Sequence, residues 1–154
     1  MHNTVQLKGF VRAALTDVKT GRVRMGRWHQ NVITADGLQN YACGSIGAVA
    51  GSKQIGWMQC ATQTAAPVTT QTSASGEFEA RKSTSNTFSA SGTLQCTASW
   101  ATNEANASAL GAVALYNTST AATGSCASVA TFATSQKTTD QTLSVTYQWR
   151  LATA

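Results

Sequence analysis

The stretch LSVTYQWRL, residues 143–151, decides the fold of this chain. Its apolar side chains fall on every second residue, and Ser, Thr, Gln and Arg fill the positions between them. This alternation with a period of two is typical of a β-strand that is buried on one face and polar on the other. The same period runs through residues 5–15, so the chain is expected to contain a half-buried strand near each end.

Other strand-like runs recur between these two strands, and polar or glycine-containing segments separate them. About eight short strands at such spacing are typical of an all-β domain. We therefore predict a mostly β fold, a two-sheet antiparallel β-sandwich of the jelly-roll kind, with residues 1–154 as a single domain. The expected strands are 5–15, 22–33, 54–61, 78–85, 87–100 (joined to the preceding strand around Asn86), 110–116, 125–132 and 143–151.

One segment departs from the strand pattern and predicts a short helix over about 34–46. Thr34 can cap the first free backbone N–H groups, and Asp36 lies in the first turn, where the helix dipole favours an acid. Leu38 and Tyr41 then follow at helical spacing. We expect no other helix in the chain.

The composition limits the class of protein. The 154 residues carry a formal net charge of +5, yet only 11% of them are charged, against about a quarter in an average domain. Apolar residues make up 42% and recur throughout, which argues against disorder. No run approaches the ~18 apolar residues of a membrane span. The N-terminus lacks the pattern of a secretory signal, so we expect synthesis in a cytoplasm.

The net positive charge lies in one segment. Within residues 1–30, six basic side chains accompany a single acid, Asp17, whereas basic and acidic residues are balanced beyond them. Residues 17–21 end in Gly21 and have the composition of a turn, which predicts an N-terminal basic hairpin over about 5–33.

The polar face of this hairpin is the predicted binding surface. Alternation places Val23 and Met25 inward and the neighbouring arginines outward, with Trp28 beside them as an exposed interface anchor. Such a patch can dock an acidic protein, which we expect rather than nucleic acid. The alternative is that basic side chains protect an exposed strand edge from aggregation. The candidate partner-binding residues are Lys8, Arg12, Arg22, Arg24, Arg27 and Trp28.

Groups that could carry out catalysis are scarce. The two histidines, His2 and His29, are expected near a chain end and a strand end, and no Ser–His–Asp signature is present. Glu77 and Glu79 would share one face of a strand, where Arg81 offers an ion-pair partner. We predict that the chain is not an enzyme, and we expect no cofactor, no metal site, no small-molecule substrate and no membrane partner.

Cysteine and tryptophan side chains are expected to serve mainly in the core. The four cysteines (43, 60, 96 and 126) include no C-x-x-C pair, so zinc is not expected. Free thiols are favoured, and a disulfide formed after release from a cell stays open as an alternative. Trp100 and Trp149 lie on the apolar faces of their strands, and Cys96 alternates with Trp100 as a small buried residue.

Several short motifs follow one another in a recognisable order. These are Asp-x-x-Thr-Gly at 17–21, Asn-x-Ile-Thr-x-x-Gly at 31–37, Ala66-Pro67, Glu-x-x-x-Arg at 77–81, Glu-Ala-Asn at 104–106, Leu-aromatic-Asn at 115–117 and Lys-Thr-x-Asp-x-x-Leu-x-Val at 137–145. Over nearly the whole chain, this order resembles a widespread group of small structural proteins of tailed bacteriophages. Two positions depart from that pattern: residues 61–64 replace a Gly-Thr-Gly, and an acid is missing at 111–112.

The resemblance implies a virion structural protein without catalytic activity. We expect a capsid decoration or cement protein on the capsid surface, bound across neighbouring subunits of the major capsid protein and associated with copies of itself. A tail component, such as a tail-tip, adaptor or receptor-binding module, is the first alternative. A small carbohydrate- or nucleic-acid-binding module that uses exposed aromatic and arginine side chains is the second.

Overall fold

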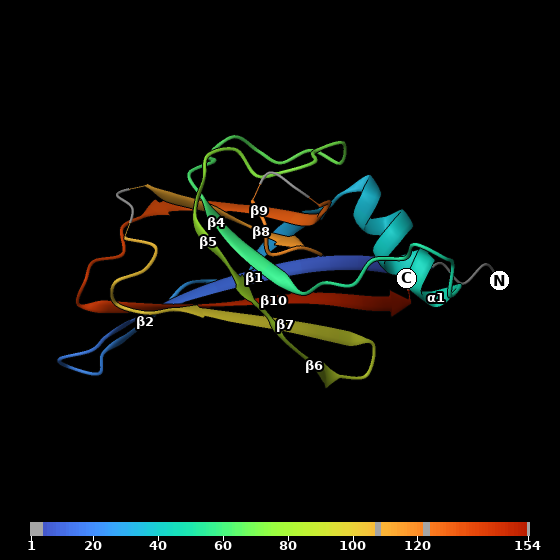
Figure 1. The fold of residues 1–154 in the computed structure, drawn as a ribbon. Helices are drawn as coiled ribbons and strands as arrows, with labels where there is room; N and C mark the ends of the chain where they lie inside the picture. The colour runs from blue at the N-terminus through green and yellow to red at the C-terminus, as the bar shows by residue number, and fades with distance from the viewer. Residues whose placement is uncertain (1–4, 107–108, 122–123, 154) are drawn as a thin grey trace.

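The computed structural model describes residues 5–106, 109–121 and 124–153 of the chain, so His2 lies outside the described residues. Within these ranges the chain forms ten strands and a short helical segment (Figure 1). The strands are β1 (Val5–Asp17), β2 (Val23–Met25), β3 (His29–Ile33), β4 (Trp57–Ala61), β5 (Glu77–Ser83), β6 (Ser85–Ala90), β7 (Thr93–Trp100), β8 (Leu110–Tyr116), β9 (Cys126–Ser135) and β10 (Gln141–Thr153). The helical segment comprises η1 (Gly37–Cys43) and α1 (Gly44–Ile46).

All ten strands belong to one antiparallel sheet, in the order β5-β4-β8-β9-β3-β1-β10-β7-β6, with β2 added beside β1. Two corners bend this sheet around the core. At the first, β3 pairs through residues 29–31 with β1 and through residues 32–33 with β9. At the second, β5 and β6 are separated only by Thr84, although β5 pairs with β4 and β6 pairs with β7. The sheet therefore nearly closes into a barrel (Figure 1).

The predicted mostly β, antiparallel fold with one short helical segment is confirmed. The two separate sheets of a sandwich are not found, because β3 carries the hydrogen bonding from one layer to the other, and a jelly roll is not confirmed. There are ten strands rather than about eight. The expected strand 22–33 is interrupted at 26–28, and the expected strand 87–100 turns at Gly92, which has a φ of +68°. The junction expected around Asn86 lies instead at Thr84.

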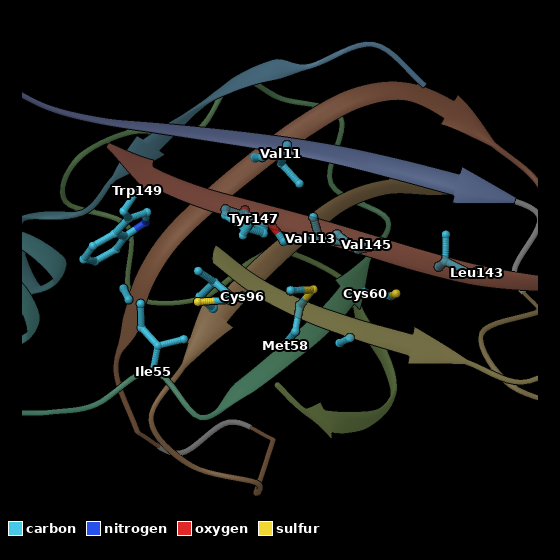
Figure 2. Close-up of a cluster of buried hydrophobic side chains, with 14 of the residues drawn as sticks. Val11, Ile55, Met58, Cys60, Cys96, Val113, Leu143, Val145, Tyr147 and Trp149 are labelled. Atoms are coloured by element: carbon cyan, nitrogen blue, oxygen red, sulfur yellow. Dashed lines mark hydrogen bonds between the residues drawn. The ribbon is translucent and has the colours of Figure 1, made fainter. Parts of the chain in front are cut away.

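The core lies between the two layers and follows from the alternation in the sequence. Val145 and Tyr147 of β10 face Met58 of β4 and Val113 of β8 (Figure 2). The Tyr147 hydroxyl donates a hydrogen bond of 2.7 Å to the Val113 carbonyl, which satisfies a polar group that would otherwise be costly to bury. As predicted, the core also contains three residues of β7 and β10: Cys96, Trp100 and Trp149.

The helical segment begins as its sequence predicts. The Thr34 hydroxyl accepts a hydrogen bond of 2.9 Å from the Gly37 N–H, so Thr34 is the predicted cap. The segment then winds as a π-helix over Gly37–Cys43 before three α-helical residues. Gly37 is required because a Cβ at this position would lie 2.0 Å from the Ala127 carbonyl oxygen of β9.

A second, smaller core lies on the outer side of β4 and β8. The loop of residues 62–76 contributes Ala74, whose N–H donates a hydrogen bond of 2.9 Å to the Tyr116 hydroxyl. Beside them, Arg81 is buried and forms the predicted ion pair with Glu77 at 3.3 Å. The expected shared carboxylate face is not found. Glu79 lies at an irregularity of β5, with a φ of +66°, and accepts a hydrogen bond from the backbone of Ala105 instead.

Candidate partner-binding surface

The structure divides the six predicted partner-binding residues between two surfaces. Directly opposed residues of antiparallel strands share one face. Arg24 of β2 opposes Leu15 of β1, and Leu15 packs against the core. Arg24 therefore lies on the core side of the sheet, at an open end of the barrel. Lys8 and Arg12 occupy the alternate positions of β1, which form the outer face.

The predicted orientation of the return strand is therefore wrong. Val23 and Met25 oppose Thr16 and Ala14 on the outer face and are 52% and 57% exposed, although they were expected to point inward. The turn decides this outcome, because its length sets the register and a shift of one residue turns every side chain to the other face. The turn itself forms at the predicted residues, since the Asp17 carboxylate accepts a hydrogen bond of 2.7 Å from the Thr20 N–H.

On the outer face, two arginines stack on two aromatic rings. The guanidinium carbon of Arg12 lies 4.6 Å from the centre of the Trp28 ring. The guanidinium of Arg150, in β10, lies 4.5 Å from the Phe10 ring and 5.7 Å from the Trp28 ring. We call these four side chains the arginine–aromatic cluster. Cation–π contacts of this kind hold both partners in one orientation.

The sequence predicted only Arg12 and Trp28 of this cluster. Arg150 and Phe10 meet because β1 and β10 pair over their whole length, with Lys8 opposite Arg150 and Phe10 opposite Gln148. One signal could have revealed Phe10, since it is the only aromatic residue at a polar position of the alternating segment 5–15.

Among the residues that the structure describes, no acidic side chain pairs with the two arginines of the cluster, Arg12 and Arg150. The Arg150 Nε donates a hydrogen bond of 3.0 Å to the Gln148 side chain, which in turn donates one of 2.9 Å to Gln95. Neutral Ser and Thr residues occupy the neighbouring outward positions of β10 and β7. The surface thus combines free positive charge with an ordered, half-exposed indole.

Two grooves lie at opposite ends of the barrel. The first, which we call the β2–β9 groove, has a volume of about 420 Å³. Its lining includes the apolar side chains of Leu15, Phe132 and Leu143 together with the exposed residues Arg24 and Arg27. Arg22 lies close by, in a smaller depression that it shares with Arg24.

The second groove, which we call the helix–β6 groove, has a volume of about 560 Å³ and is more uniformly apolar. It runs between the helical segment and the ends of β6 and β10. Ile46 and Phe88 border it and are 80% and 84% exposed. The one charged side chain in its lining, Lys53, is paired at 3.1 Å with Asp36.

Three of the four cysteines lie in the interior of the protein rather than at these surfaces. All four are free thiols, and burial raises the pKa of Cys96 and of Cys126 to about 12. Thiols held in the protonated form are poor nucleophiles. Across residues 5–106, 109–121 and 124–153, no group of three or more His, Cys, Asp or Glu residues is placed to hold a metal ion. Nor does any helix within those ranges have the length and apolar character to span a membrane.

Comparison with known proteins found no match, either to a family model, to a curated protein or to a solved structure.

Proposed function

We propose that this chain is a bacteriophage virion structural protein, a capsid decoration or cement protein that binds across neighbouring subunits of the major capsid protein and stabilises the shell. The observation that carries the proposal is the arginine–aromatic cluster on the outer face of the sheet. Tryptophan and arginine are the residues in which protein–protein binding energy concentrates. The order of sequence motifs, which resembles phage structural proteins, supports the location in a virion.

The cluster suits the docking of an acidic surface. Stacking on Trp28 and Phe10 orients the guanidinium groups of Arg12 and Arg150 before a partner arrives, so little side-chain freedom is lost on binding. Their uncompensated charge attracts carboxylates of the capsid subunit and increases the association rate. Many such contacts across a shell add up through multivalency, although each one is weak.

The proposal includes association between copies of this chain through the helix–β6 groove. Its apolar border, with Phe88 and Ile46 exposed, is the kind of surface that marks an interface. Because its single charged side chain is already paired, two copies can meet there without the repulsion expected between chains of net charge +5. Phe88→Glu should shift the molar mass of the purified protein, measured by sedimentation equilibrium, from that of an oligomer to that of a monomer. An unchanged mass would exclude this contact.

Binding to particles that lack the protein tests the docking surface. Arg12→Gln should weaken saturable binding at physiological salt, whereas Lys19→Gln removes the same charge from the exposed turn and should leave binding unchanged. Lys19 is a suitable control because its ion pair with Asp140 is exposed. Absence of saturable binding by the unmodified protein would contradict the proposed function.

The alternative position in the particle is the tail, where the same surface would bind a tail subunit. An image of the particle with this chain located discriminates between the two, because a decoration protein covers the shell in many copies and a tail component is present in few.

A further inference from the structure

We propose that the β2–β9 groove binds an extended segment of another polypeptide, with alternating apolar and acidic side chains, as an additional β-strand along the edge of β9. This inference concerns a different surface from the arginine–aromatic cluster. It does not depend on the location of the protein in a virion.

The edge of β9 is only partly used. On one side β9 pairs with β8 as far as Thr131 and, after an irregularity, again at Ser135, which opposes Leu110. On the other side it pairs with β3 at Ser128 and Val129 alone. From residue 130 to residue 135, this second edge has no strand partner among the residues that the structure describes. Backbone groups on such an edge are available to a further strand.

The irregular segment of residues 26–28, between β2 and β3, keeps the groove open. If the register of β3 and β9 continued, Ala133 would oppose Trp28 and Ser135 would oppose Gly26. Residues 26–28 instead form the irregular segment between β3 and β2, and the Gly26 N–H is bonded to the Ala13 carbonyl at 2.8 Å. The wall of the barrel therefore stays open beside β9, which leaves the volume of about 420 Å³.

The lining of the groove selects the occupant. The apolar side chains of Leu15, Phe132 and Leu143 can receive every second side chain of an extended segment. The lining contains Arg24 and Arg27 but no acidic residue, and neither arginine takes part in any ion pair of the described residues. Both arginines are exposed at the mouth of the groove, where their long side chains can reach carboxylates at the outward-facing alternate positions of the segment.

Another copy of this chain cannot supply such a segment. Only Glu77-Phe78-Glu79 in the sequence alternates acidic and apolar residues, and it is already paired within β5. The occupant is therefore a different polypeptide.

A synthetic peptide tests the inference on the whole protein. The probe is a short capped peptide of alternating glutamate and valine, and its binding is measured by fluorescence anisotropy and by amide hydrogen exchange. We expect saturable binding that slows the exchange of amides within residues 130–135. The double variant Arg24→Gln/Arg27→Gln should bind about fivefold more weakly, because two partly exposed ion pairs are lost. Lys19→Gln, which removes a positive charge from the exposed turn outside the lining of the groove, should bind as tightly as the unmodified protein.

Two control peptides separate the contributions of charge and of backbone pairing. A lysine–valine peptide should not bind, and neither should a glutamate–valine peptide with alternate backbone nitrogens methylated, because it keeps the side chains but loses ladder donors. Absence of binding by the unmethylated glutamate–valine peptide, equal binding by either control peptide, or protection outside residues 130–135 would overturn the inference. So would self-association of the double variant without any peptide binding, which would assign Arg24 and Arg27 to protection of the strand edge. Binding to capsids is measured separately, so failure here leaves the proposed function intact.

Discussion

Replacing Arg81 by methionine removes the charged group that holds the outer core together. The Arg81 guanidinium pairs with Glu77 at 3.3 Å, donates hydrogen bonds of 3.1 and 3.2 Å to Thr118 and lies 3.5 Å from the centre of the Tyr116 ring. Only 12% of the Glu77 side chain is exposed. Without Arg81, the Glu77 carboxylate would remain almost buried without its cation. Breaking a buried pair in this way costs about 3–5 kcal/mol, which is a large part of the ~5–15 kcal/mol that stabilises a typical domain.

Urea denaturation followed by tryptophan fluorescence measures this loss, and a second variant shows where it comes from. Arg81→Met/Glu77→Gln removes both charges, so it should be more stable than Arg81→Met by at least ~1 kcal/mol. The matched control is Lys82→Met on the same strand, whose ion pair with Glu104 is 30% exposed on the lysine side. Lys82→Met should lower the free energy of unfolding by less than ~1 kcal/mol.

Two results would refute this reasoning. If Arg81→Met costs no more than Lys82→Met, the buried pair contributes nothing beyond a surface contact. If the double variant is less stable than Arg81→Met alone, the cost does not come from an unpaired carboxylate.

Two further predictions concern packing and pH. Gly37→Ala should lower the free energy of unfolding by about 2 kcal/mol through collision with the Ala127 carbonyl. Gly56→Ala, where the added Cβ meets nothing within 4 Å, should lower the free energy of unfolding by less than ~0.5 kcal/mol. Thermal denaturation of both variants measures the two losses, and equal losses would contradict this account. Burial raises the pKa of Cys96 from 9.0 to about 12, so the folded chain keeps a proton that the unfolded chain loses, and stability falls as pH rises from 9 toward 12. Cys96→Ala should reduce that fall by about 1.4 kcal/mol per pH unit, measured from urea midpoints; an unchanged slope would contradict it.

Local patterns in the sequence were sufficient to predict much of the fold. The alternation in 143–151 and in 5–15 correctly identified β10 and β1, because burial on one face demands an apolar residue at every second position. The cap at Thr34 depends on a hydroxyl within reach of the Gly37 N–H, which sequence spacing alone specifies. Trp100 and Trp149 were correctly expected in the core, because each shares the apolar face of its strand.

The features that could not be predicted depend on register and on contacts between distant segments. Nothing in the sequence near Thr84 indicates that β5 and β6 belong to opposite layers, since this follows from the pairing of each with a different neighbour. The same holds for the arginine–aromatic cluster, in which Phe10 and Arg150 come from opposite ends of the chain. The π-helical winding of η1, whose first residue Gly37 approaches the Ala127 carbonyl of β9, is likewise not indicated by any local pattern in the sequence.

The two ends of the barrel differ in a way that bears on assembly. The helix–β6 groove is apolar, and its only lining charge is neutralised by Asp36, whereas Arg22, Arg24 and Arg27 lie at the opposite end without any ion pair among the described residues. Copies that approach through their arginine-bearing ends repel each other, and this repulsion weakens as salt is added. Copies that approach through the helix–β6 groove bury apolar surface, which salt does not screen. If the chain forms an oligomer, its arginine-bearing ends should therefore face outward, free for a partner of opposite charge.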